Sequence, residues 1–251
     1  MARSQQGKSD WLLTACAWGV HLYTALGAAF GLLAIHYAEV GRFRASFLAM
    51  AATIVIDSSD GTLARAVRIR QRVPGVDGAL LDNIVDYLTF VIVPMVFVMR
   101  AGMVPAGWAG LGIVSLVAIA SAYQFSQTAA KTPDHYYTGF PSYWNIAVFY
   151  LYYARLTATV NAAALVALAV MVFVPIRYIY PSRTVTLRPL TIGYGIFWGA
   201  VTIAMILALP DFHPVLLYLS LSYVAYYFAV SLFLNVRNSI AGAGPGEPPR
   251  I

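Results

Sequence analysis

Residues 57–65 read D-S-S-D-G-T-L-A-R and residues 78–86 read G-A-L-L-D-N-I-V-D, and these two stretches decide what the chain can be. Both lie inside an otherwise apolar sequence, and they hold four of its ten acidic residues: Asp57, Asp60, Asp82 and Asp86. A carboxylate within a membrane span is costly unless it is paired or binds a cation. The nearby Arg65 cannot neutralise four carboxylates, so a bound cation is the simplest explanation for them.

The composition predicts an integral membrane protein. Of the 251 residues, 60% are hydrophobic and 10% are charged, and the mean hydropathy is +0.71. Soluble domains carry about 25% charged residues, whereas the apolar runs here reach the roughly 20 residues that cross a bilayer. We therefore expect an all-α, polytopic membrane helical bundle with about eight transmembrane helices. The expected spans are 11–37, 43–69, 78–99, 107–129, 141–157, 159–179, 190–209 and 213–235.

No long polar linker interrupts these runs. We therefore expect residues 1–237 to form a single membrane domain, and residues 238–251, rich in Gly and Pro, to form a flexible tail. The first apolar run is too long for the core of a signal peptide and is interpreted as a retained span. The single cysteine, Cys16, excludes a disulfide within the chain.

The sixteen basic residues predict the orientation. With the N-terminus in the cytoplasm and eight spans, twelve of them fall on the cytoplasmic side, as the positive-inside rule favours. Both termini and the four aspartates then face the cytoplasm. Because the net charge of +6 gathers at the ends of spans, membrane phospholipids or an anionic substrate are the expected partners, and nucleic acid is not. The four basic residues expected outside are Arg42, Arg44, Arg100 and Arg155.

Helical spacing predicts a metal site. Residues spaced by three or four positions share one face of a helix. One such stripe consists of Asp57, Asp60, Gly61, Ala64 and Arg65, and a second consists of Gly78, Asp82 and Asp86. A hairpin of the two helices would bring the stripes together. Oxygen ligands in this number suit Mg²⁺ or Mn²⁺, and a site with two ions is geometrically reasonable.

The small residues of the stripes indicate a ligand as well as a metal. Gly61, Ala64 and Gly78 leave the shared face bare, so that a flat ligand can approach the backbone, and Arg65 can pair with a pyrophosphate oxygen. Intramembrane acids also serve as ion relays, so a cation transporter is an alternative. A transporter has no evident use for the glycines and the arginine.

The two stretches resemble the CDP-alcohol phosphotransferases. The signature of that family is D-x-x-D-G-x-x-A-R, a spacer and G-x-x-x-D-x-x-x-D, and every specified position is met within about an eighth of the chain. The resemblance implies two divalent ions, Mn²⁺ or Mg²⁺, that grip the pyrophosphate of a CDP-linked substrate, and it implies a homodimer. The implied metal ligands are Asp57, Asp60, Asp82 and Asp86. The implied nucleotide site is Gly61, Ala64, Arg65 and Gly78. Asp86 is implied as the base that deprotonates the acceptor hydroxyl.

The spacer, residues 66–77, is longer than is usual in this family. The chain is similar to bacterial members of the family that join free choline to CDP-diacylglycerol. The similarity lies in the long spacer, in residues 139–145 (G-F-P-S-Y-W-N) and in residues 181–191. The resemblance therefore implies an enzyme of the bacterial inner membrane that transfers a phosphatidyl group to choline and releases CMP. Serine, inositol phosphate and glycerol phosphate are the alternative acceptors.

Choline presents a trimethylammonium group, which proteins usually bind with aromatic faces. The aromatic candidates for such a cage are Tyr143 and Trp144, with Tyr136 and Tyr137. A belt of aromatic residues at the membrane interface is the alternative interpretation. Arg183 and Arg188 are candidates for binding lipid or substrate phosphate, and they leave an anionic acceptor open.

Overall fold

The structure is a computed structural model that describes residues 2–127, 136–179 and 188–240, with side chains described for 11–127, 139–176, 178 and 189–233. The chain divides into two compact units, Met1–Ala101 and Gly102–Ile251, and each is described by itself. The expected tail therefore lies mostly outside the described residues.

Within the described residues, six helices are long and apolar enough to cross a membrane. The all-α membrane architecture predicted from the sequence is thus confirmed, with two three-residue strands in addition. Many large apolar side chains on these helices face outward, among them Leu22, Leu32 and Val55, as expected of helices surrounded by lipid. The six spans are Trp11–Glu39, Phe43–Ala66, Gly78–Arg100, Trp108–Ser126, Pro189–Ala208 and Pro214–Phe233.

The predicted count of eight spans is not confirmed, because the fifth and sixth expected spans are short helices. Helix α7 (Trp144–Tyr153) has 10 residues and α8 (Ala158–Met171) has 14. At about 1.5 Å per residue neither reaches across a hydrocarbon core of about 30 Å. Ser142, with φ at 53°, lies before α7, and a turn followed by a strand comes after α8. The turns before α7 and after α8 make these two helices shorter than the spans expected from the apolar composition.

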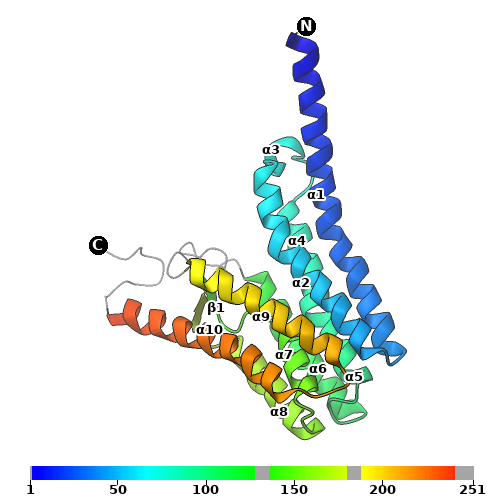
Figure 1. Ribbon diagram of the computed structural model, residues 1–251, viewed down its shortest axis with the longest axis vertical. Helices are drawn as coiled ribbons and strands as arrows, with labels where there is room; N and C mark the ends of the chain where they lie inside the picture. The colour runs from blue at the N-terminus through cyan, green and yellow to red at the C-terminus, as the bar shows by residue number, and fades with distance from the viewer. Residues whose placement is uncertain (1, 128–135, 180–187, 241–251) are drawn as a thin grey trace. The chain divides into compact units, whose positions relative to one another are not determined.

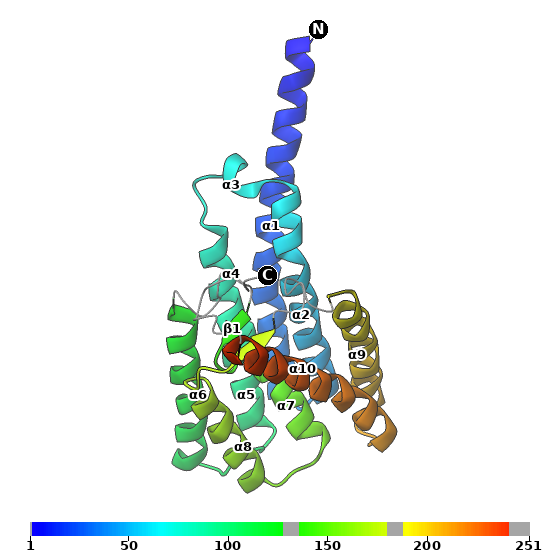
Figure 2. The same ribbon diagram turned by 90° about the vertical axis from the view of Figure 1, so that its left-hand side faces the viewer.

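The first unit is built on α1 (Ala2–Glu39), against which α2 (Phe43–Ala66) and α4 (Gly78–Asp86) pack. Figures 1 and 2 show the three helices side by side, with the short α3 (Ile69–Arg72) beyond the end of α2. The buried residues of α1 recur with alternating steps of three and four, the spacing of a helix that packs along one seam. The residues of this series are Ala17, Val20, Thr24, Gly27, Gly31, Ala34 and Ala38, and His21, next to Val20, is buried as well.

Glycine at two seam positions lets α4 and its continuation approach α1 closely. A Cβ atom on Gly27 would lie 2.7 Å from Cγ1 of Val85, and one on Gly31 would lie 3.3 Å from side-chain carbons of Thr89 and Val93. Small residues are typical of close helix contacts in membranes, where packing rather than water exclusion holds helices together. Farther along α1, the carbonyl of Ala34 accepts a 2.7 Å hydrogen bond from Oγ of Ser46 on α2.

The third span is one continuous helix with a wider turn in its middle. It runs through α4, the π-helical segment η1 (Tyr87–Ile92) and α5 (Val93–Arg100). Pro94 lacks a backbone N–H and would crowd the carbonyl four residues earlier in a regular α-helix, so the wider turn accommodates it. The π-turn begins directly after Asp86.

The second unit contains α6 (Trp108–Ser126), α7, α8, α9 (Arg188–Ala208) and α10 (Pro214–Ile240). Strands β1 (Tyr136–Thr138) and β2 (Arg177–Ile179) pair antiparallel, α6 packs on α8, and α9 on α10. The α9–α10 pair carries polar contacts, including 2.8 Å between the hydroxyls of Thr191 and Tyr226. The hydroxyl of Tyr194 donates to Ser222 at 2.6 Å.

The seam of α1 yields a test. Replacing Gly27 with leucine should lower the thermal unfolding temperature of the purified protein, because overpacking a tight contact costs about 1–3 kcal/mol. Gly19 provides the matched control, since a Cβ atom there would meet no other atom within 4 Å. Equal melting temperatures for Gly27→Leu and Gly19→Leu in detergent would contradict the close approach of α1 and α4.

Candidate functional site

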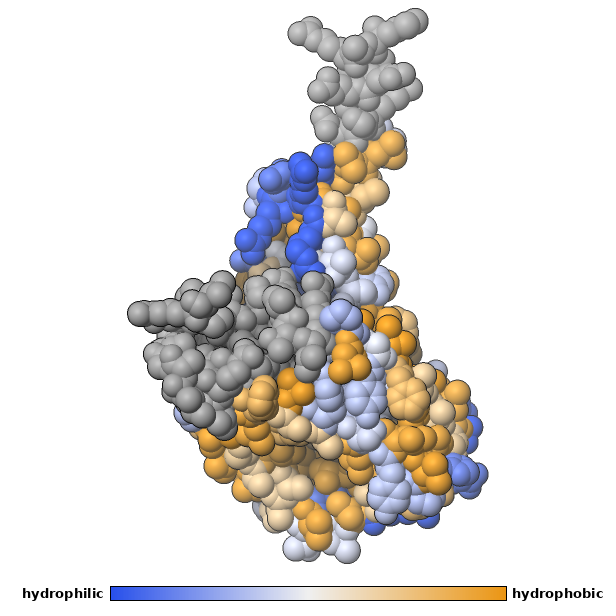
Figure 3. Space-filling model, turned by 60° about the vertical axis from the view of Figure 1, so that its left-hand side comes forward, coloured by the Kyte–Doolittle hydropathy of each residue, from blue (hydrophilic) through white to orange (hydrophobic). Residues whose placement is uncertain are grey.

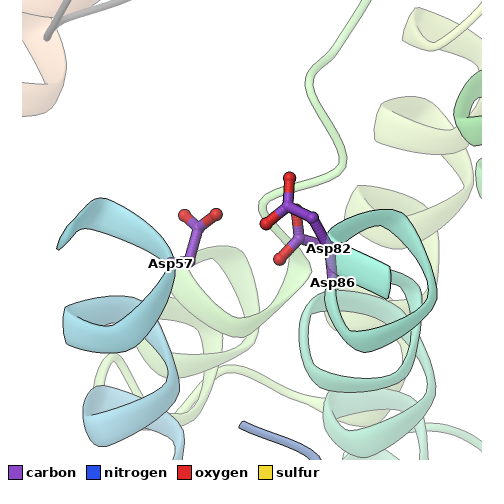
Figure 4. A group of neighbouring side chains, drawn as sticks. All are labelled: Asp57, Asp82 and Asp86. Atoms are coloured by element: carbon purple, nitrogen blue, oxygen red, sulfur yellow. The ribbon is translucent and has the colours of Figure 1, made fainter. Parts of the chain in front are cut away.

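Three of the four predicted aspartates meet in the first unit. One carboxylate oxygen from each of Asp57, Asp82 and Asp86 lies within 4.8 Å of the others, and all three side chains are half-buried. Figure 4 shows Asp57 extending from α2 toward Asp82 and Asp86 on α4. Carboxylates this close repel one another, and a divalent cation with oxygen ligands at 2.0–2.6 Å would remove that repulsion. The donor set therefore fits Mg²⁺ or Mn²⁺.

Asp60 lies outside this group of three. It is buried, and its Oδ2 accepts a 2.8 Å hydrogen bond from the hydroxyl of Thr24 on α1. One residue earlier, the hydroxyls of Ser59 and Tyr23 lie 2.8 Å apart. A step of three residues turns a side chain about 60° around a helix, which carries Asp60 from the face of Asp57 toward α1. These bonds between α1 and α2 fix the rotation of α2 at the carboxylate cluster.

The predicted nucleotide residues of α2 lie toward its C-terminal end. Gly61 and Ala64 are half-buried and Arg65 is exposed. The Arg65 guanidinium donates a 2.9 Å hydrogen bond to the hydroxyl of Thr62, and its Nη1 would lie 3.3 Å from a Cβ atom on Gly61. The guanidinium thus lies beside the bare backbone of Gly61.

Gly78 is covered by a residue that the sequence did not single out. A Cβ atom at this position would lie 3.1 Å from Cε1 of His21, a buried residue of α1. Nε2 of His21 is buried and has no hydrogen-bond partner among the described residues. The bare face that predicted a ligand contact at Gly78 therefore accommodates the imidazole ring in this structure. No spacing in the sequence connects residue 21 with residue 78, so this contact could not be predicted before the packing of α1 and α4 was known.

Asp77 has a defined structural role that the sequence analysis missed. It is the N-cap of α4, and its Oδ1 accepts hydrogen bonds from the backbone N–H groups of Ala79 at 3.0 Å and Leu80 at 3.1 Å. Aspartate is among the preferred N-cap residues because its side chain pairs amides that lack partners within the helix. An aspartate directly before a predicted helix start was the available signal. The cap fixes where α4 begins, and hence the register of Asp82 and Asp86.

The aromatic candidates lie in the second unit. Trp144 is fully buried, packs edge-on against Phe140, and donates a 2.7 Å hydrogen bond from Nε1 to the hydroxyl of Ser121. Tyr143 is half-buried at the N-terminus of α7. Trp144 thus acts as a core residue in this arrangement. The side chains of Tyr136 and Tyr137, in β1, lie outside the described residues.

The turn at residues 139–142 is fixed by bonds from Phe140 and Ser142 to α6 and by the close approach of Gly139 to Val172. Gly139 has φ at 79°, and a Cβ atom there would collide with the carbonyl oxygen of Val172. Gln124 bonds to both sides of the turn, donating to the carbonyl of Phe140 and accepting from the hydroxyl of Ser142, each at 2.5 Å. Glycine and serine are therefore needed here for the turn itself.

Comparisons with known proteins decide the family. A phosphatidylcholine synthase of Legionella pneumophila is 39% identical over 224 residues, which is 86% of this chain and 88% of that protein. One of Pseudomonas aeruginosa is 32% identical, covering 88% of this chain and 92% of its own length. One of Rhizobium johnstonii is 31% identical, covering 87% and 90%. No model of a known protein family matches the chain.

The chain belongs to the phosphatidylcholine synthase family.

Membership confirms the resemblance predicted from the motif. It assigns the chain to the transmembrane transferases of phospholipid biosynthesis that produce phosphatidylcholine. Of the two arginines predicted to bind lipid or substrate phosphate, Arg183 lies outside the described residues. Arg188 begins α9, and its side chain is not among those described.

The carboxylate cluster predicts cation binding that depends on particular aspartates. Mn²⁺ titration of the purified protein, followed by the electron paramagnetic resonance signal of free Mn²⁺, should show at least about tenfold weaker binding for Asp57→Asn, Asp82→Asn and Asp86→Asn. Asp77→Asn is the matched control, because an amide oxygen preserves the helix cap. If Asp77→Asn weakened Mn²⁺ binding as much as the others, the cluster would not be the metal site.

Proposed function

We propose that this protein transfers the phosphatidyl group from CDP-diacylglycerol to choline and releases CMP, in a reaction that depends on Mn²⁺ or Mg²⁺. The convergence of Asp57, Asp82 and Asp86 carries the proposal. It supports a divalent cation at the position where the resemblance places the pyrophosphate of the substrate. When bound, two such ions would neutralise charge on the pyrophosphate and on the leaving phosphate.

The side chains of the motif divide the work. Asp57, Asp82 and Asp86 would hold the cations. The resemblance implies Asp60 as a fourth ligand, and because Thr24 engages its Oδ2 on the side of α1, Asp60 could contribute only its other carboxylate oxygen. Arg65 pairs with a phosphate oxygen of the nucleotide half. Gly61 and Ala64 leave the backbone of α2 open to that half, and Gly78, with the His21 ring against it, limits the site at the start of α4.

The chemical step is a displacement at phosphorus. The choline hydroxyl oxygen attacks the phosphorus that bears the diacylglycerol, and the bond from that phosphorus to the oxygen shared with CMP breaks. Asp86 accepts the proton of the hydroxyl, and CMP leaves with the bridging oxygen. The acyl chains remain in the bilayer throughout.

The acceptor site is proposed to include Tyr143, with Tyr136 and Tyr137 as further candidates. The complete burial of Trp144 and its bond to Ser121 support a role in holding Tyr143 in place rather than in touching choline. Arg183 and Arg188 remain candidates for contact with lipid phosphate.

We place the enzyme in the bacterial inner membrane as a homodimer, with the site and both termini facing the cytoplasm. Six and eight spans are both even numbers, so either count leaves the two termini on one side. The cytoplasm supplies the nucleotide-activated substrate.

Release of CMP by the purified protein tests the function. With CDP-diacylglycerol and Mn²⁺, CMP should appear when choline is added and should stop when a chelator removes the metal. Serine, inositol phosphate and glycerol phosphate are supplied in separate reactions. Release with one of those three and not with choline would overturn the acceptor. If none of the alcohols supported CMP release, the result would favour the cation transporter that the aspartates also allow.

Asp86→Asn tests the assignment of the base. Turnover should fall by roughly 10²–10⁴, the usual contribution of general-base catalysis, while binding of CDP-diacylglycerol is largely kept. The measurement is the initial rate of CMP release at saturating metal, with binding of CDP-diacylglycerol followed separately. Near-normal turnover in Asp86→Asn would remove Asp86 from this role.

A further inference from the structure

The connection between α2 and α4 presents a concentration of positive charge. Arg65 lies in the last turn of α2, and Arg68 and Arg70 follow within five residues; all three side chains are exposed. We refer to Arg68 and Arg70 as the α3 patch, since Arg65 is assigned to the substrate in the proposed function. Figure 3 shows strongly hydrophilic residues gathered at this end of the first unit, next to the hydrophobic flank of its helices.

The local fold turns these arginines outward. Arg68 has φ at 51° and ψ at 50°, a left-handed conformation that ends α2 and redirects the chain. The short α3 then packs on α1 and α2. Val73, at the end of α3, is buried, whereas Arg68 and Arg70 are exposed. The apolar residues therefore anchor the segment to the unit, and the arginines form its outer surface.

No described acidic side chain pairs with Arg68 or Arg70. Residues 66–77 contain one acid, Asp77, and its Oδ1 is engaged with the backbone amides at the start of α4. At the opposite end of the same unit, Arg100 lies 3.1 Å from Glu39. One arginine is thus paired at that end, whereas neither Arg68 nor Arg70 is paired with an acid among the described residues, so the patch is complementary to an anion.

The position of the patch identifies the anion. It lies in the connection between two segments long and apolar enough to cross a membrane, Phe43–Ala66 and Gly78–Arg100. Such a connection is expected at the level of the lipid headgroups. Phosphate oxygens are concentrated there, and the planar guanidinium fork suits them. We propose that the α3 patch binds the phosphate headgroups of anionic phospholipids of the bilayer. This inference stands independently of the reaction proposed above, because it needs no turnover.

The test measures lipid binding without substrates. Purified wild-type protein in a neutral detergent at low salt is titrated with phosphatidylglycerol, and the rise in melting temperature gives an apparent affinity. An arginine near an anionic surface contributes about a fivefold change in affinity, so Arg68→Gln with Arg70→Gln should weaken binding about 25-fold. Arg68→Lys with Arg70→Lys should keep most of the affinity. High salt should weaken wild-type binding, since the patch is exposed.

Matched variants separate this site from general charge. Arg42→Gln with Arg44→Gln removes two arginines from the other end of α2 and should leave the affinity for phosphatidylglycerol unchanged. Equal weakening by both glutamine pairs would overturn the α3 patch as the site. The proposal would also be overturned if phosphatidylglycerol raised the melting temperature no more than phosphatidylcholine does. A shift produced by CDP-diacylglycerol but not by phosphatidylglycerol would assign the arginines to the substrate and would likewise overturn the proposal.

Discussion

The close approach of α4 to α1 is the constraint on which the site depends. Without a Cβ atom at Gly27, α1 accepts Val85 at a distance that a larger residue would forbid, and Gly31 leaves a tight fit for Thr89. The bond from Thr24 to Asp60 fixes α2 against the same helix. The carboxylates of α2 and α4 can therefore meet, although they are far apart in the sequence. Mutual repulsion of these acids opposes the arrangement, and the packing on α1 holds it against that repulsion.

Much of this unit could be predicted from the sequence, because helical spacing is a local property. Asp82 and Asp86 are one turn apart and share a face of their helix whatever surrounds them. The expected hairpin of the two helices brings the stripe that contains Asp57 to that face. Asp60 illustrates the limit. Its spacing of three from Asp57 allows either the carboxylate face or the face toward α1, and only the position of Thr24 decides between them. The His21–Gly78 contact likewise depends on how α1 and α4 pack, which spacing within either helix does not specify.

The second unit shows why the described residues do not confirm two of the spans expected from composition. Apolar residues are required in a buried turn as much as in a membrane helix, so the run around residues 141–157 resembled a span. Gly139 and Ser142 adopt left-handed conformations, and Gln124 closes the turn with two hydrogen bonds. A buried polar network of this kind is fully paired only in one conformation. The aromatic stretch that suggested a choline cage therefore includes residues whose first role is to hold this turn.

Charge is separated along α2 in a way that bears on the order of binding. Asp57 and Arg65 are eight residues apart, about 12 Å along the helix axis, so acids occupy one end of the stripe and the guanidinium the other. An anionic pyrophosphate is attracted to Arg65 and repelled by the three carboxylates while these lack a metal. A divalent cation at the cluster would turn the repulsion by the three carboxylates into attraction. On the proposed function, metal and lipid substrate must then favour one another's binding, since each removes a repulsion that the other would meet.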